Sequence, residues 1–489
     1  MLVSSNTPEK AKTVTPPEGA RILAEQAISL AREHGQSTLL RAISEVGIPD
    51  PIAWLTPRLN SDRGVLWSDG RTGMELAALG VRRLWRATER PSLSAQEFLA
   101  QERQLLVQGW LGSGQPSLTE LPLALGGFSF QDGAADPEDP WSGWPTHELM
   151  IPELLLVRWA GTPTMAVVTA VVNPEDEVDL VAQNLVDARR MLLEPVLATE
   201  SQTDSVAPQH VAERGEGQEH WCARIEAAKR AFGTSALDKV VLARRSHFVA
   251  PLGSCFDPAV TLERLRRSHP DAFVFAITHR EGKWFLGATP ELLARVSSGR
   301  FDGHALAGTI ASSENEDEAD QLAEELRTSV KNQYEHDVVI RDIERALSVH
   351  CERVEVAKEP TVRRLTELQH LETAVRGRVR EREALLEIVG DLHPTPAVGG
   401  HPRAEAARYL AEHEALHRGW YASPIGWIGA RGEGAFAVAL RCAILTEHEA
   451  VAFVGAGIVA DSVPEDEWQE TELKLRTVAS ALALRRTGS

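Results

Sequence analysis

A lysine stands inside an apolar segment, in the run DKVVLARR at residues 238–245. If this segment is a strand, Lys239 alternates with Val241 and Ala243 and shares their face. A lysine in such a position ordinarily extends its ammonium group to solvent. Held in a closed site instead, Lys239 could act as a general base, because burial lowers the pKa of an amine toward neutrality.

The last predicted helix carries acidic residues on one stripe, in the run PEDEWQETELKLRTVASALALRR that starts at Pro464. Positions i, i+3, i+4 and i+7 of that stripe are Glu467, Glu470, Thr471 and Lys474. A solvated face with i,i+4 ion pairs has the same pattern. If a second acidic helix faces it, the stripe could hold a hard cation, because Mg²⁺ binds carboxylate oxygens while keeping waters for other ligands.

That second helix is predicted around the run SVKNQYEHDVVIRDI at residues 329–343. An apolar stripe passes through Leu326, Val330 and Tyr334, and Glu335 lies beside it. Carboxylates at the border of such a stripe are usually surface residues. Opposite the last helix, Glu335 would instead complete an all-oxygen cation site.

Two charged residues interrupt other apolar segments. Glu291, in FLGATPELLARV, follows Thr-Pro at a predicted strand end, as either a helix N-terminal acid or a carboxylic acid kept protonated for proton donation. Arg441, in AVALRCAIL, lies within a predicted strand. An unpaired buried guanidinium is costly, so we expect a carboxylate partner from the protein or from a ligand. The segments FVGAGIVADS and HALAGTI place small residues at strand ends, where backbone N–H groups can approach a ligand carboxylate.

The elements that must position these residues arrive in clusters of strands and helices. Residues 1–18 are rich in proline, serine and lysine and are expected to be a mobile tail. Residues 19–197 contain short alternating runs typical of antiparallel strands, residues 198–219 form a polar linker or loop, and residues 220–489 hold the candidate chemistry. The clustering favours an α+β fold with large antiparallel sheets covered by helices.

Composition narrows the class of protein. The chain has 51 basic and 70 acidic residues, a formal net charge of −19, which disfavours nucleic acid and anionic membranes as partners. No apolar run approaches the roughly 20 residues of a membrane helix, and the N-terminus lacks the apolar core of a signal peptide. The four cysteines form no CxxC pair, so neither a zinc site nor a disulfide framework is indicated. We therefore expect a cytoplasmic protein.

Nine motifs occur in an order that resembles the chorismate-utilising enzymes. They cover the chain from about residue 220 to the C-terminus and read DKVVLAR, GATPELL, LAGT, KNQYEH, LQHLET, LHPTPAVGG, RGWYASPIGW, FAVALRCA and GAGIVADSVPEDEWQET. The resemblance implies two large antiparallel sheets packed together with helices on the outside. It also implies that LHPTPAVGG forms a turn at the floor of the chorismate pocket, where small residues leave room for the substrate ring.

Roles for individual residues follow from the same resemblance. Lys239 would activate water for attack at C2 of chorismate, and Glu291 would protonate the departing C4 hydroxyl. Glu335 and Glu470 would hold Mg²⁺, with Glu467 supporting the ion through water. The residues implied to bind the substrate are Thr309, His370, Ala397, Tyr421, Arg441 and Lys474, with the backbone of Ala456 and Gly457.

Within the family, the pattern is most similar to the members that convert chorismate reversibly to isochorismate. Lys239 favours water as the nucleophile, since the ammonia-using relatives tend to have glutamine there. Ala397 disfavours the salicylate synthases, which add a pyruvate elimination and commonly have threonine nearby. Anthranilate or aminodeoxychorismate synthase component I, and an idle chorismate-binding homologue, remain alternatives. The expected protein is a monomer, and menaquinone, catechol siderophore and salicylate synthesis all fit the resemblance.

Overall fold

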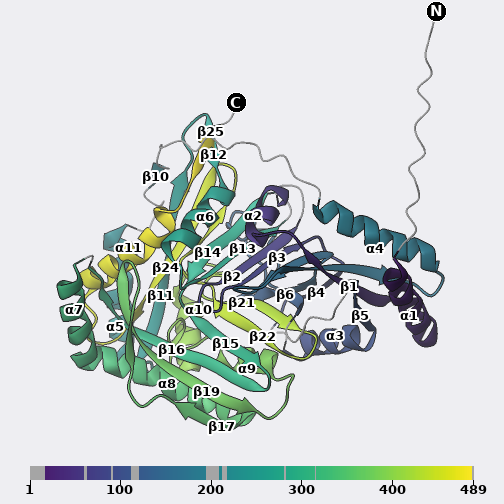
Figure 1. Ribbon diagram of the computed structural model, residues 1–489. Coiled ribbons are helices and arrows are strands. Elements are labelled where there is room, and N and C mark those ends of the chain that lie inside the picture. The colour runs from purple at the N-terminus through teal and green to yellow at the C-terminus, as the bar shows by residue number, and fades with distance from the viewer. Residues whose placement is uncertain are drawn as a thin grey trace, which may run out of the picture.

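The computed structural model describes residues 17–59, 63–89, 92–111, 121–193, 209–211, 217–279, 282–313 and 315–486. Two large sheets, of 13 and 10 strands in these residues, lie at the centre, and helices flank them (Figure 1). Residues 1–16 of the expected tail, and residues 198–208 and 212–216 of the expected linker, lie outside the described residues. The expected α+β class with two large, mainly antiparallel sheets is confirmed.

The 13-stranded sheet contains the strand that begins with Lys239. Its neighbours pair antiparallel except for one parallel pair, β1 with β5. In spatial order the strands are β10 (Gln209–Val211), β11 (Lys239–Val249), β24 (Glu449–Ile458), β23 (Cys442–Leu445), β14 (Lys283–Thr289), β13 (Phe273–His279), β2 (Gly64–Asp69), β3 (Met74–Leu79), β8 (Leu154–Arg158), β9 (Thr164–Val172), β1 (Thr38–Val46) and β5 (Leu106–Trp110), with β20 (Gly400–His401) also paired to β11.

The 10-stranded sheet is antiparallel throughout its described pairs. Its order is β17 (Cys351–Val356), β19 (Leu368–Val379), β16 (Arg300–Ala311), β15 (Leu292–Ser297), β22 (Gly434–Val438), β21 (Pro424–Gly429), β6 (Pro122–Phe128), β7 (His147–Ile151) and β4 (Arg83–Ala87), with β18 (Thr361–Arg364) also paired to β19. A third, two-stranded sheet pairs β12 (Ser254–Phe256) with β25 (Leu484–Arg486).

The helices cover the outer faces of the sheets. Their bounds are α1 (Glu18–His34), α2 (Pro51–Leu55), α3 (Ser92–Gln104), α4 (Val178–Leu193), α5 (Gln218–Phe232), α6 (Pro258–Ser268), α7 (Glu316–Thr328), α8 (Val330–His350), α9 (Leu385–Leu392), α10 (Arg403–His413) and α11 (Pro464–Ala479). In Figure 1, α1 and α4 lie at one end of the molecule, and α7 and α11 lie at the other. Among the described residues, no helix is both long and apolar enough to cross a membrane.

The core is layered because neighbouring residues of a strand face opposite sides of its sheet. In β24, Phe453 belongs to the main core cluster with Phe285 and Phe436, whereas Ala456 packs in a separate cluster with Trp221 of α5. Aromatic rings fill much of the main cluster: Trp141 lies 5.0 Å from Phe285 and 5.6 Å from Phe453 between ring centroids.

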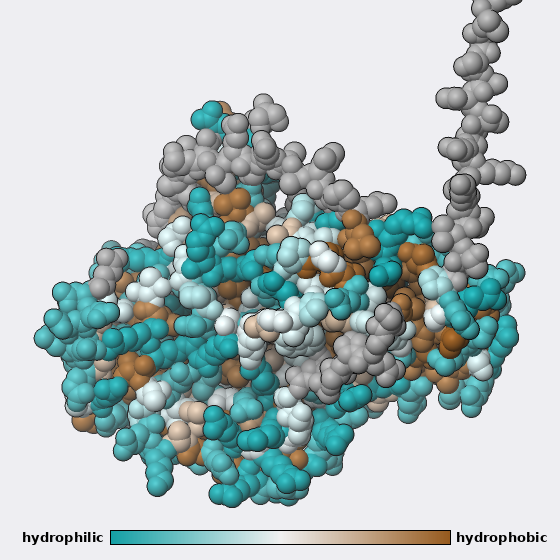
Figure 2. All heavy atoms as spheres, in the orientation of Figure 1, coloured by the Kyte–Doolittle hydropathy of each residue, from teal (hydrophilic) through white to brown (hydrophobic). Residues whose placement is uncertain are grey.

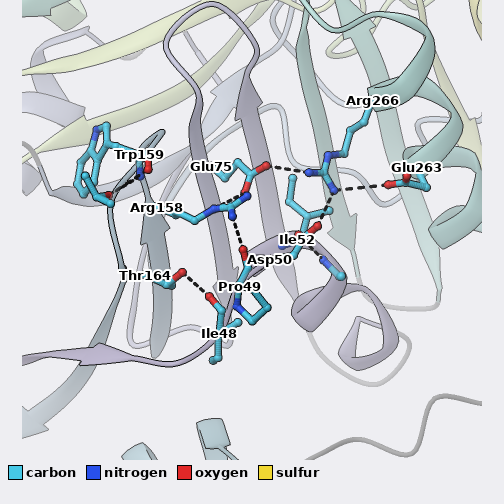
Figure 3. Close-up of polar contacts among 12 residues, drawn as sticks. Ile48, Pro49, Asp50, Ile52, Glu75, Arg158, Trp159, Thr164, Glu263 and Arg266 are labelled. Atoms are coloured by element: carbon cyan, nitrogen blue, oxygen red, sulfur yellow. Dashed lines mark hydrogen bonds and ion pairs between the residues drawn. The ribbon is translucent and has the colours of Figure 1, made fainter.

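A polar network fastens α6 to the 13-stranded sheet (Figure 3). Arg266 of α6 donates to Glu75 of β3 at 2.8 Å and to Asp50 at 3.2 Å, and Arg158 of β8 donates to Glu75 at 3.0 Å. Asp50 also caps α2 by accepting from the backbone N–H of Ile52 at 2.9 Å. The network therefore ties α6 to β3, β8 and the N-terminal cap of α2.

Figure 2 shows mainly hydrophilic residues, with hydrophobic ones gathered over the end formed by α1 and α4. The large exposed apolar side chains on those two helices are Ile22, Leu180, Met191 and Leu193.

Candidate active site

A cavity between the 13-stranded sheet, β16, β19, α8 and α11 collects most of the residues singled out from the sequence. Its charged and polar lining comes from five elements and the loops between them. The residues of this lining are Lys239, Glu291, Thr309, Lys331, Asn332, Glu335, His370, Tyr421, Arg441, Glu467, Glu470 and Lys474, together with Ala397, Gly455 and Gly457.

Lys239 begins β11, and only 3% of the residue is exposed. Its Nζ donates a hydrogen bond of 3.1 Å to Oε2 of Glu335 on α8. Gly457 of β24 faces it, and a Cβ at this position would lie 2.9 Å from the Lys239 Cε. Glycine is therefore what lets the lysine side chain lie flat against the neighbouring strand and enter the cavity.

Glu291 lies in the short connection between β14 and β15 and is 6% exposed. Burial raises the pKa of its carboxyl to about 7, although the positive charges of Lys474, Lys239 and Arg441 act in the opposite direction. A carboxyl with this pKa is partly protonated near neutral pH. It can therefore donate a proton to a leaving group, as a general acid must.

Three glutamates, Glu335 of α8 and Glu467 and Glu470 of α11, line the same cavity. Burial and the neighbouring Glu470 raise the pKa of Glu467. Burial acts to raise the pKa of Glu470, but Lys474, Lys331 and Arg441 together outweigh it, so this pKa is lowered. Two carboxylates that repel each other in one buried space favour a cation between or beside them.

Each of these glutamates has a lysine partner. Beside the pair of Lys239 with Glu335, Lys331 Nζ lies 3.1 Å from Oε1 of Glu467, and Lys474 Nζ lies 2.6 Å from Oε1 of Glu470. Partial burial opposes the charge of Lys331, but Glu467, Glu335 and Glu470 together raise its pKa. These six side chains thus form three ion pairs inside the cavity.

The donor set suits a hard divalent cation. Mg²⁺ is usually bound by one or two carboxylates, with waters and substrate oxygens completing its shell. In the part of the chain that the structure describes, no three His, Cys, Asp or Glu side chains form a ready-made metal cage. Glu335, Glu467 and Glu470 line one cavity and supply the oxygen donors and negative charge that such an ion requires.

A second polar row crosses the cavity opposite the glutamates. Thr309 Oγ1 lies 3.1 Å from Nδ1 of His370, and His370 Nε2 lies 3.4 Å from Nη2 of Arg441. Burial, Arg441 and Lys474 hold the pKa of His370 well below its usual value, so the imidazole is neutral at pH 7. Arg441 has φ of 49°, a left-handed conformation that is uncommon for a residue other than glycine.

Tyr421 completes the wall beside β24. Burial raises the pKa of its hydroxyl, so Tyr421 remains protonated and can donate a hydrogen bond. A Cβ at Gly455 would lie 2.9 Å from that hydroxyl, which explains the first glycine of the run GAGI.

The floor of the cavity is the turn that contains Ala397 and Val398, after the end of α9. Backbone N–H groups of Val398 and Gly399 donate to Thr395 O at 3.1 and 2.9 Å. Arg418, fully buried, donates to Val398 O at 2.9 Å and to Val241 O of β11 at 2.6 Å. The same side chain thus fixes the turn against the strand of Lys239.

Of the residues singled out from the sequence for this site, Ala456 does not line the cavity. Its methyl group faces the opposite side of β24 and packs in the cluster that contains Trp221 and Ile225. The period of two places Gly455 and Gly457 on the cavity side instead.

Sequence analysis also missed Lys331 and Arg418. Lys331 could have been found, because it precedes Glu335 by four residues on a predicted helix and so shares its face. Nothing local distinguishes Arg418 from a surface arginine.

The chain is similar to known proteins over most of its length. A family model described as chorismate binding enzyme matches residues 25–483. The chain is 33% identical over 470 residues to the salicylate biosynthesis isochorismate synthase of Pseudomonas aeruginosa, covering 94% of this chain and 93% of that protein. It is 30% identical over 465 residues to the isochorismate synthase MenF of Bacillus subtilis, covering 93% and 96%.

Two solved structures have a fold similar to that of this chain. The menaquinone-specific isochorismate synthase MenF of Escherichia coli superposes with a TM-score of 0.71 at 26% identity, covering 93% of this chain and 100% of that chain. Anthranilate synthase component I of Streptococcus pneumoniae has a TM-score of 0.65 at 19% identity, covering 90% and 92%, and so shares the fold.

Proposed function

Because this chain belongs to the chorismate-binding enzyme family, we propose that it is an isochorismate synthase, which converts chorismate and isochorismate reversibly into each other. The observation that carries the proposal is that a buried lysine and a buried glutamate with a pKa of about 7 line one cavity. The names of its relatives agree, since those of Pseudomonas aeruginosa and Bacillus subtilis are both isochorismate synthases.

In the proposed reaction, Lys239 takes a proton from water as the water oxygen bonds to C2 of the ring. The ring double bonds shift, the C4–O bond breaks, and Glu291 gives its proton to the departing hydroxyl, which leaves as water. Lys239 ends protonated and Glu291 ionised, and exchange with water restores both. The reverse reaction uses the same two groups with their roles exchanged.

Water is the proposed nucleophile because a lysine can accept a proton from it. Lys239 lies at 3.1 Å from Glu335, and this contact holds the Nζ at a defined place in the cavity. A base that is positioned before the substrate arrives lowers the entropic part of the barrier.

The dianionic substrate requires local positive charge in a chain whose formal net charge is −19. We assign one carboxylate to Arg441, to the Tyr421 hydroxyl and to the backbone at Gly457. Lys474 lies in the same cavity and can donate a further hydrogen bond, and the neutral His370 lies beside Arg441. Ala397 leaves the ring side of the floor free of bulk.

Glu335 and Glu470 would hold Mg²⁺, and Glu467 would support the ion through water. When bound, the ion supplies positive charge that orients and polarises a substrate carboxylate. We also propose that the protein is a cytoplasmic monomer; its four cysteines are free thiols, as is usual in a reducing compartment.

The test is to incubate the purified protein with chorismate and Mg²⁺ and to resolve the products by liquid chromatography and mass spectrometry. The proposal predicts isochorismate in reversible balance with chorismate, absent with Lys239→Ala and retained with Lys358→Ala, which changes an exposed lysine between β17 and β18. Salicylate with pyruvate would assign the chain to the salicylate synthases. No turnover with water or ammonia would identify an idle homologue.

A further inference from the structure

The three lysine–glutamate pairs in the cavity differ in how firmly they are enclosed. The side chain of Lys239 is 4% exposed and that of Lys474 is 18% exposed, whereas that of Lys331 is 40% exposed. Lys474 is also held by a second bond of 2.9 Å from its Nζ to Gly455 O. Of the three ammonium groups, that of Lys331 therefore moves into solvent at the smallest cost in free energy.

Glu467, the partner of Lys331, is enclosed, whereas Lys331 is partly exposed. Glu467 is only 5% exposed at its side chain, and it accepts a hydrogen bond of 2.7 Å from Ser462 Oγ as well as that of Lys331. A buried carboxylate held in place by a hydroxyl cannot follow a departing lysine to the surface. When Lys331 leaves, an unneutralised charge remains in the cavity.

We propose that Lys331 is a built-in competitor of the divalent cation: it neutralises Glu467 while the ion is absent and leaves when the ion binds. This inference rests on the proposed function, because that function places Mg²⁺ among Glu335, Glu467 and Glu470. It adds a residue that controls how tightly the ion is held before substrate arrives.

Charge counting supports the exchange. Before substrate binds, with all three pairs ionised, the three glutamates and three lysines sum to zero and Arg441 adds a further positive charge to the cavity. Adding a divalent ion without moving a lysine would therefore place two more positive charges beside an ammonium group. Lys239 and Lys474 are enclosed, and both are assigned to the reaction or the substrate. Lys331 is on α8 one turn before Glu335, and its long stem can turn toward solvent without any change in the helix.

The consequence is that removing the positive charge of Lys331 strengthens metal binding. The pair is intermediate between an exposed ion pair and a buried charged hydrogen bond, so we expect the dissociation constant of the ion to fall about tenfold. An ordinary surface ion pair with no access to the metal would leave this constant unchanged.

The experiment titrates Mn²⁺ into the full-length protein without substrate and follows free Mn²⁺ by electron paramagnetic resonance, with Mg²⁺ added to displace it. Lys331→Met is expected to bind Mn²⁺ about tenfold more tightly than the wild type. Lys331→Arg, which keeps the charge, and Lys358→Met, which removes an exposed lysine elsewhere, are expected to match the wild type.

Equal or weaker binding by Lys331→Met than by the wild type would overturn the proposal, as would an absence of Mn²⁺ binding by both. Tighter binding by Lys331→Arg would also overturn it, because then side-chain shape and not charge would be the cause. Since no chorismate is present, inactivity toward chorismate would refute the proposed function without changing this result.

Discussion

Replacing Glu291 by glutamine should abolish turnover and, at alkaline pH, stabilise the protein. Glutamine keeps the size of the side chain but cannot donate an acidic proton, so we expect turnover to fall by a factor of about 10² to 10⁴. The stability effect follows from the buried carboxyl, whose pKa is raised from 4.5 to about 7. At 1.36 kcal/mol for each tenfold change in the proton equilibrium, this difference corresponds to about 3 kcal/mol.

The direction of the stability change with pH follows from which protonation state of Glu291 the folded chain favours. Below pH 4.5 the carboxyl is protonated in both folded and unfolded chains, so it is as easily accommodated as an amide. As the pH rises from 4.5 to 7, the unfolded chain ionises first, and the wild type loses stability relative to Glu291→Gln. Above pH 7 the difference stays near its full value.

The assay is urea unfolding of wild type and Glu291→Gln at pH 5 and at pH 8.5, with Glu352→Gln as a control at an exposed position of β17. We expect the advantage of Glu291→Gln to be small at pH 5 and about 3 kcal/mol at pH 8.5. If the stability of Glu291→Gln relative to the wild type does not increase with pH, or is lower at pH 8.5, burial does not keep Glu291 protonated.

Three further outcomes follow from the site. Arg418→Met should lower the free energy of unfolding by about 3 kcal/mol, measured by urea unfolding, because it leaves the buried Glu414 without its closest cation. Arg441→Lys should raise KM for chorismate about tenfold with a smaller change in kcat, because lysine cannot form the paired hydrogen bonds of a guanidinium; an unchanged KM would place the substrate carboxylate elsewhere. EDTA should stop turnover and excess Mg²⁺ should restore it. Turnover that persists in EDTA would show that the reaction requires no metal ion.

Local periodicity was enough to predict much of the candidate site. Glu467, Glu470 and Lys474 lie on one face of α11 because the repeat of a helix is fixed by its backbone, and all three line the cavity. The same rule of alternation in a strand explains why Ala456 does not: its neighbours Gly455 and Gly457 occupy the cavity side of β24. The motif marks the segment, but only the pairing of β24 with β11 settles which residues face inward.

The order of the strands could not be predicted from local pattern. β11 pairs with β24, which is about 200 residues away in the chain, and this pairing sets Gly457 opposite Val241 and next to the side chain of Lys239. Hydrophobic alternation says that a segment is a strand and leaves its partner open. The role of Arg418 could not be predicted for a related reason, since its partners Val241, Val398 and Glu414 come together only in the folded chain.

The central claim, that water bonds at C2 while the C4 hydroxyl leaves, is tested most directly with ¹⁸O-labelled water. Chorismate and Mg²⁺ are incubated with the protein in labelled water, and the position of the heavy oxygen in the product is found by fragmentation in the mass spectrometer. We expect isochorismate to carry one heavy oxygen, at C2. Chorismate recovered after equilibration should carry the heavy oxygen at C4. Isochorismate without label would show that the hydroxyl moves within the substrate, and would contradict the assignment of Lys239 and Glu291 to proton transfer with water.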